Sequence, residues 1–377
     1  MESQIPFAQD FLREACAQPG NQLFSPISIH TALAMAAEGA RGETAAELEK
    51  LLRLKAGSAG PRFSKLATEL EAPHRVDRGR ETRDRAYALA TPNALFVHQG
   101  LELETPFRNT LQNSFRAEPH RVDFGKPDAA RSVIHKWIEK ATFSKIRTIL
   151  TPDLPTPDTR LVLANAVYLK AAWWQPFEKS FSQEGRFRVT AKSDVKATFM
   201  RESRELEYLE TPLAHVVAIP YEQQALSMVV VLPKESHGLA QLLASESMEK
   251  WIARGEECRV NLQLPRFQLS VTTDLKEPLQ RLGVKTAFDS EKADFSGMTK
   301  QERLFIGFAL HKAIIRVDEE GTEASAATVV GMLKSAVSSR PPVQFSADHP
   351  FLFFLRHERT GLVLFAGCVA DPAAAGK

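Results

Sequence analysis

The sequence predicts one domain of the α+β class. Helical hydrophobic spacing dominates the first part of the chain, whereas most later segments are short apolar or alternating runs that are typical of strands. No internal repeat, low-complexity tract or linker separates the two kinds of segment. We therefore expect residues 1–377 to form a single domain, although the length alone would allow two or three.

The N-terminal part carries the clearest helix signals. Apolar residues recur at helical spacing between Phe7 and Ala15, which predicts an amphipathic helix. A second helix is expected from Ser25 to Gly39, with a proline directly after the serine. Thr44 and Glu47 have the spacing of a capping box and predict the start of a third helix.

The rest of the chain is interpreted mainly as strands. A helix is expected near Pro106 and another from Ala129 to Ile149. Strand patterns cover Ala90–Val97, Leu161–Tyr168, Phe187–Met200, Leu226–Leu232, Val260–Phe267, Leu304–Val317, Phe351–Leu355 and Leu362–Gly367. The last two runs are expected to pair with each other in a second sheet.

Composition excludes several classes of function. Hydrophobic residues make up 44% and charged residues 25% of the chain, which is ordinary for a soluble globular protein. The net charge of +2 predicts no general attraction to nucleic acid or membrane, and no apolar run reaches membrane-spanning length. The three cysteines, Cys16, Cys258 and Cys368, are expected to be free thiols, because they form no CxxC pair and are odd in number. We expect a monomer.

The N-terminus lacks the basic region, apolar run and cleavage site of a signal peptide. The expected location is therefore the cytoplasm, or the chain is a mature form with its leader removed. An enzyme is not expected, because the chain has no nucleophile elbow, HExxH motif, Walker loop or dinucleotide-binding motif. The histidines show no metal-ligand spacing, so we expect neither a metal nor a cofactor.

The segment from Asp318 to Pro342 has an unusual pattern. Read as a strand, one face carries small residues followed by apolar ones: Thr322, Ala324, Ala326, Thr328, Val330 and Met332. Glu323 supplies the only charge on the other face. The pattern predicts an exposed loop that is able to become a buried strand.

Both flanks of this loop resemble the serpin family, whose fold is built around a mobile reactive-centre loop. Residues 310–327, LHKAIIRVDEEGTEASAA, are similar to the serpin strand that runs into the loop hinge. Residues 348–372, DHPFLFFLRHERTGLVLFAGCVADP, look like the serpin C-terminal signature. The resemblance implies the serpin fold, with about three sheets and eight or nine helices. It also implies suicide inhibition of serine proteases.

The resemblance also implies roles for particular residues. The hinge would comprise Glu319, Glu320, Gly321, Thr322, Glu323, Ala324, Ser325, Ala326 and Ala327. Ser25 and Ser28 of the FSPISI segment, together with Asn165 and His311, would form the shutter, where the central sheet must part. For Ser25, simple helix capping is the competing interpretation. Trp173, in KAAWWQPF, would lie at the breach, the turn at the top of that sheet.

The position of the reactive bond stays open. Counting fourteen places from Gly321, a spacing common in inhibitory serpins, gives Ser335 before the bond and Ala336 after it. Small residues there favour an elastase-like or subtilisin-like protease. A shifted frame would present Lys334 to a trypsin-like enzyme, or Met332 or Leu333 to a chymotrypsin-like one.

Two further alternatives remain. A non-inhibitory serpin acting as a carrier or chaperone is the second interpretation, although the small residues of the hinge argue against it. The polar stretch before residue 91 holds Arg75, Arg78, Arg80, Arg83 and Arg85, and some serpins bind glycosaminoglycans in this part of the fold. Because acidic residues interrupt the cluster, we interpret it as a solvated surface.

Overall fold

The computed structural model describes residues 4–55, 59–71, 87–117, 119–322 and 341–374. The α-helices are α1 (Gln4–Cys16), α2 (Pro26–Gly39), α3 (Gly42–Leu52), α4 (Ala59–Glu71), α5 (Thr105–Phe115), α6 (Pro127–Ala141), α7 (Leu239–Ser245), α8 (Met248–Trp251) and α9 (Lys276–Arg281). The described chain thus combines helices and sheets, as the α+β class requires.

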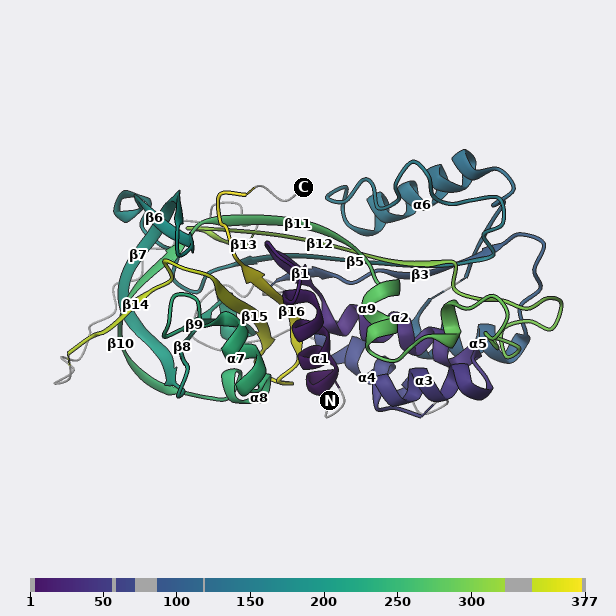
Figure 1. Cartoon of the computed structure of the whole chain (residues 1–377), viewed down its shortest axis with the longest axis horizontal. Coiled ribbons are helices and arrows are strands. Elements are labelled where there is room, and N and C mark those ends of the chain that lie inside the picture. Colours follow the sequence, from purple (N-terminus) through teal and green to yellow (C-terminus); the bar gives the residue numbers. More distant parts are fainter. Residues whose placement is uncertain (1–3, 56–58, 72–86, 118, 323–340, 375–377) are drawn as a thin grey trace.

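A seven-stranded sheet, here called the central sheet, runs along the molecule. It consists of β2 (Ala88–Ala90), β3 (Asn93–His98), β4 (His120–Val122), β5 (Leu161–Ala172), β11 (Phe267–Asp274), β12 (Phe308–Asp318) and β13 (Gly321–Thr322). Its strand order is β11-β12-β13-β5-β3-β4, and β2 also pairs with β5. In Figure 1 its long strands lie between α6 on one side and most other helices on the opposite side.

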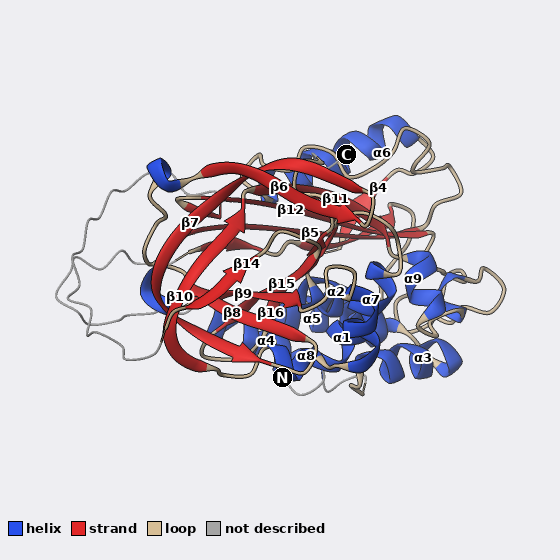
Figure 2. Ribbon diagram, turned by 60° about the vertical axis from the view of Figure 1, so that its left-hand side comes forward, coloured by secondary structure: helices blue, strands red, loops and turns tan. Residues whose placement is uncertain are grey.

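The remaining strands form a second, nine-stranded sheet. It consists of β1 (Gln22–Phe24), β6 (Gln183–Thr190), β7 (Ser193–Glu210), β8 (Ala214–Pro220), β9 (Leu226–Pro233), β10 (Glu256–Pro265), β14 (Val343–Ser346), β15 (Phe351–His357) and β16 (Val363–Val369). The long strand β7 pairs with β6, β8 and β10 and so joins all these strands into one sheet. The described strands therefore form two sheets, whereas the family resemblance implied about three. Figure 2 shows these strands at one end and most helices at the other.

Two apolar clusters hold the layers together. The larger cluster packs α1 and α2 against β15 and β16 and the adjoining face of the central sheet. The smaller one joins Ile134 and Ile138 of α6 to the opposite face of β5 and β12. Because β5 and β12 are covered on both faces, their sequences are nearly continuous apolar runs, and polar residues within them stand out.

Most predicted elements are present, although the runs Ala90–Val97 and Val260–Phe267 each span two strands, and three further predictions were wrong. Thr44 and Glu47 form no capping box, because α3 begins at Gly42; both side chains instead accept backbone N–H groups from the segment 285–294. The predicted strand Phe187–Met200 is a hairpin, β6 and β7, because the chain turns at 190–193. The helix expected to reach Ile149 ends at Ala141, and two residues with positive φ follow soon after it.

Candidate functional site

The base of the loop already lies inside the central sheet. β12 and β5 are parallel and pair directly from Phe308–Ile314 to Val162–Tyr168. Beyond that point the chain turns at the end of β12, and β13 lies between the two strands. Thr322 is opposite Val317 of β12 and Ala171 of β5, with antiparallel pairing on both sides. We call the interval between β5 and β12 the slot.

Gly321 is required at the entrance of this slot. Its φ of +144° lies in a region that residues with a side chain rarely adopt. A Cβ built on it would meet the carbonyl oxygen of Ala171 at 2.3 Å and the Cα of Ala172 at 2.8 Å. The absence of a side chain therefore allows the backbone of β13 to approach β5 closely.

The turn before Gly321 is held by the segment that follows β5. The indole Nε1 of Trp173 donates to the carbonyl oxygen of Asp318 at 2.8 Å, and the backbone N–H of Trp173 donates to Glu320 at 3.0 Å. The N–H of Phe177 donates to the carbonyl oxygen of Glu319 at 2.9 Å. Three successive carbonyls of the turn are thus fixed by this one segment.

The carboxylate of Glu319 is a buried anchor. Its side chain is 3% exposed and pairs with Arg266, whose Nε donates to it at 2.7 Å, and with the hydroxyl of Ser182. Burial acts to raise the pKa of Glu319, but the hydrogen bonds from Arg266 and Ser182 outweigh it and lower the pKa. The neighbouring Glu320 pairs with Lys179 at 2.7 Å nearer the surface.

Thr322 is fully buried and hydrogen-bonded. Its hydroxyl lies 2.7 Å from the hydroxyl of Tyr221, whose ring stacks on Trp173 with centroids 4.4 Å apart. Burial strongly raises the pKa of Tyr221, so the phenol is neutral and can share this hydrogen bond. The sequence pattern placed Thr322 on the inward face, and its side chain does point into the core.

The structure brings the four predicted shutter residues together below the slot entrance. Asn165 of β5 and His311 of β12 are directly opposite each other, and the Oδ1 of Asn165 bonds the Nδ1 of His311. The Nδ2 of Asn165 donates to the hydroxyl of Ser28 at 2.5 Å and also to Asn93 of β3. The Ser28 hydroxyl donates in turn to the backbone oxygen of residue 166. We call Ser25, Ser28, Asn93, Asn165 and His311 the shutter network.

The protonation state of His311 follows from its partners. Its Nε2 accepts the backbone N–H of Ser25 at 3.0 Å, so the proton must lie on Nδ1, which donates to Asn165. The ring is fully buried, and burial lowers the pKa of His311 to about 3. A neutral imidazole with one defined tautomer therefore links β12 to β5 and to α2.

Ser25 combines both of the roles considered for it. Its side chain caps α2 by accepting the N–H of Ser28 at 3.3 Å. Only its backbone N–H reaches His311. The side chain of Ser25 is therefore a helix cap, whereas its main chain is part of the shutter network.

Other predictions fall outside the described residues. These are the hinge residues Glu323, Ala324, Ser325, Ala326 and Ala327, the reactive-bond residues Ser335 and Ala336, and the alternatives Met332, Leu333 and Lys334. The arginines at 75–85 also lie outside them. Within the described ranges no group of histidine, cysteine and acidic side chains could hold a metal ion. No helix in those ranges is both long and apolar enough to cross a membrane.

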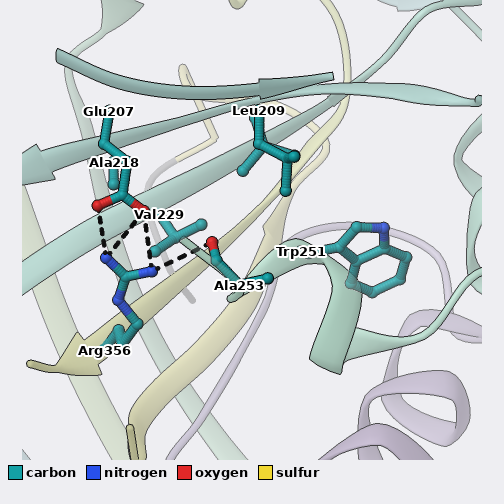
Figure 3. Close-up of a pocket in the computed structure, with 8 residues that line it drawn as sticks. Glu207, Leu209, Ala218, Val229, Trp251, Ala253 and Arg356 are labelled. Carbon is teal, nitrogen blue, oxygen red and sulfur yellow. Dashed lines mark hydrogen bonds and ion pairs between the residues drawn. The ribbon is translucent and has the colours of Figure 1, made fainter. Parts of the chain in front are cut away.

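A narrow gap with essentially no internal volume lies between the second sheet and the end of α8 (Figure 3). It is lined by Trp251 and by the ion pair of Arg356 with Glu207, whose closest atoms are 3.1 Å apart. Pockets that enclose drug-sized ligands are usually about 300–1,000 Å³. Arg356 also pairs with Glu358, so the charged side chain that lines this gap is already paired with carboxylates of the chain and does not form a binding pocket.

Sequence reasoning missed several partners of the hinge. Tyr221, Arg266 and Ser182 come from segments far from the loop in sequence, and no local pattern marks them. Asn93 was also missed, although a polar residue beginning an apolar strand was an available signal.

Comparisons with known proteins agree over nearly the whole chain. A family model described as "Serpin (serine protease inhibitor)" matches residues 2–372. A leukocyte elastase inhibitor of Bos taurus is 36% identical, with 94% of this chain and 93% of the relative covered. Serpin B10 of Bos taurus is 33% identical, covering 97% and 98%. The crystal structure of Serpin48, a highly specific serpin of the insect Tenebrio molitor, has a TM-score of 0.86 at 29% identity, covering 98% and 97%.

Proposed function

The chain belongs to the serpin family, and on that basis we propose that it is a suicide-substrate inhibitor of serine proteases that acts as a single domain. The target protease treats the loop as a substrate. Its catalytic serine attacks the carbonyl carbon of Ser335, the peptide bond to Ala336 breaks, and the new amine leaves with a proton. The hinge side then stays attached to the protease as an ester and enters the slot.

The observation that carries this proposal is the position of β13. A strand of two residues already pairs with both β5 and β12, in the direction that a longer inserted strand must take. Insertion therefore requires no new nucleus, only the extension of an existing antiparallel ladder. Each further residue gains hydrogen bonds on two sides, provided that β5 and β12 separate.

The register predicts what the inserted strand meets. Thr322 is opposite Val317 of β12 and Ala171 of β5. In an antiparallel ladder, each later residue of the loop would therefore be opposite a residue one position earlier in β12 and in β5. Six steps on, Thr328 would lie opposite both His311 and Asn165. Directly opposed residues share a face of the sheet, so the threonine would replace the direct contact between these two side chains.

The same register fits the length of the loop. Met332 would reach the first residue of β5, Leu161, and Gly331 the first residue of β12, Phe308. Ser335 would then lie just beyond the far end of both strands. Cleavage there gives an inserted strand that fills the slot and leaves the attached protease at the opposite end of the sheet.

The insertion is favourable because it buries apolar side chains. Val330 and Met332 would each gain about 1.5–3 kcal/mol on burial. Against this, Ile134 and Ile138 of α6 pack in one apolar cluster with residues of both strands, and the shutter network links the strands directly. The native form is thus held by a kinetic barrier.

Small residues around Ser335 favour an elastase-like or subtilisin-like target, and one relative is named a leukocyte elastase inhibitor. The purified protein should be incubated with elastase-like, subtilisin-like, trypsin-like and chymotrypsin-like enzymes. We expect a covalent complex that survives boiling in detergent, and mass spectrometry of the released C-terminal peptide to identify the bond. If every enzyme only cleaves the loop and remains active, the inhibitory function is wrong and a carrier role gains support.

A matched pair of variants tests insertion separately from cleavage. Thr322→Arg places a long charge at a fully buried position, whereas Thr322→Ser keeps the hydroxyl that contacts Tyr221. We expect the arginine variant to be cleaved without trapping the protease, and the serine variant to form complexes like the wild type. Cleaved wild type should melt well above the intact protein; equal melting temperatures would contradict the insertion mechanism.

A further inference from the structure

Arg204 is a buried cation close to the hinge. It lies in β7 and is 6% exposed. Its Nη1 donates to the carbonyl oxygen of Gln175, and its guanidinium lies 4.2 Å from the ring centroid of Phe177. Both contacts are with the segment that follows β5, whose residues Trp173 and Phe177 hold the hinge turn. The charge is therefore built into the support of the slot entrance.

One edge of this guanidinium is unused. Its Nε and Nη2 are buried and have no hydrogen-bond acceptor among the described residues. The N–H groups on these two atoms point in parallel, which is the arrangement that grips two oxygens of a carboxylate or phosphate. A buried guanidinium with an unpaired edge is costly, so an oxyanion there would relieve a real desolvation penalty.

The surroundings keep Arg204 charged. Burial lowers its pKa to about 10, and the nearby carboxylate of Glu202 acts in the opposite direction. The guanidinium is therefore protonated at neutral pH. Among the described residues Arg204 forms no ion pair, and Glu202 is the one carboxylate that acts on its pKa.

We propose that the Nε–Nη2 edge of Arg204 binds a small oxyanion, with inorganic phosphate and simple carboxylates as the chemical class. The bound anion would lie beside the Phe177 ring and steady the segment that carries Trp173. Binding does not depend on the inhibitory mechanism, because it concerns the intact fold alone. The competing occupant is the chain's own Glu202 carboxylate, which has the same chemistry.

The test uses the intact full chain in phosphate, acetate and chloride at equal ionic strength. Arginine Nε–H resonances are followed by NMR during each titration, and the melting temperature is recorded. In the wild type, we expect one Nε–H resonance to shift saturably with phosphate, and the melting temperature to rise by about 1–3 °C relative to chloride. Acetate should act at the same resonance more weakly, because it carries less charge.

Variants assign the site. Arg204→Lys keeps the positive charge but lacks the paired Nε–H and Nη2–H donors, and Arg204→Gln lacks both the charge and the donors. In each variant the shifting Nε–H resonance and the phosphate-dependent rise in melting temperature should be absent. Arg259→Gln is the control, since Arg259 lies on the neighbouring strand β10 and its Nε already donates to the hydroxyl of Ser203 at 3.1 Å. A phosphate effect that persists in both Arg204 variants would overturn the proposal. The proposal would also be overturned if phosphate left the wild-type Arg204 resonance unchanged while Glu202→Gln shifted it, because the chain's own carboxylate would then be the partner of that edge.

Discussion

His311 should make opening of the slot sensitive to mild acid. The folded-state pKa of about 3 lies below the value of about 6.5 expected for the unfolded chain. The neutral ring therefore stabilises the fold fully above pH 6.5, and this contribution is lost as the pH falls from 6.5 toward 3. Protonation would remove the Nε2 acceptor that receives the N–H of Ser25.

The size of the effect follows from the two pKa values. At pH 5.5, one unit below the unfolded value, the fold loses about 1.4 kcal/mol through this one group. His30 provides a matched control, because burial lowers its pKa to about 4 and it should lose nearly as much. However, the groups that His30 contacts, the rings of Phe7 and Phe63 and the carbonyl of Leu52, do not belong to β5 or β12.

The assay compares wild type, His311→Gln and His30→Gln at pH 7.5 and 5.5. Hydrogen exchange of β5 and β12 reports slot opening, and the melting temperature reports the whole fold. Each variant should lose part of the pH dependence of melting. Only His311→Gln should remove the roughly tenfold acceleration of exchange in the slot strands, measured relative to the intrinsic exchange rate at each pH. If His311→Gln keeps that acceleration, or if His30→Gln abolishes it, the reasoning about the shutter network fails.

Three substitutions at the slot entrance should differ in severity. Tyr221→Phe removes the hydroxyl that contacts Thr322 and should cost about 1 kcal/mol in a chemical unfolding titration; no change would mean that this hydrogen bond does not hold β13. Arg266→Met leaves the buried Glu319 carboxylate with the Ser182 hydroxyl but without its cation, so a loss of up to about 3 kcal/mol, smaller below the carboxyl pKa, is expected; a loss independent of pH would argue against the ion pair. Gly321→Ala places a Cβ against β5 and should expel β13, so limited proteolysis that stays as slow as in the wild type would contradict the packing.

The sequence predicts the shutter residues better than it predicts the hinge supports. Asn165 and His311 are polar residues inside apolar strands, so a buried partner for each could be expected, and their strands happen to be neighbours. Arg266 has no such signal, because a charged residue beside a strand end usually lies in solvent. Only the tertiary fold brings it to Glu319.

Local rules failed where long-range contacts decided the outcome. Thr44 and Glu47 match a capping box, but the same side-chain oxygens satisfy backbone N–H groups of a distant loop. The run that was predicted as one strand alternates correctly on both sides of a tight turn, and the hydrophobic period carries no signal for a reversal there. The orphaned edge of Arg204 is equally invisible in sequence, because it depends on what surrounds the side chain.

In the proposed mechanism the hinge and the shutter network act on the same two strands, which would fix the order in which they open. β13 separates β5 from β12 at the end where the loop enters the sheet. Away from that end the two strands pair directly, from Tyr168 and Ile314 back to Val162 and Phe308. An advancing strand must therefore break the direct ladder before it reaches the His311–Asn165 contact. Changes at the entrance should alter how readily insertion begins, whereas changes in the shutter network should alter how far it proceeds once begun. The shutter network links the two strands below the entrance, and α6 packs there in one apolar cluster with residues of both. Under the proposed mechanism, insertion would therefore meet its greatest resistance midway, after cleavage had formed the ester with the protease.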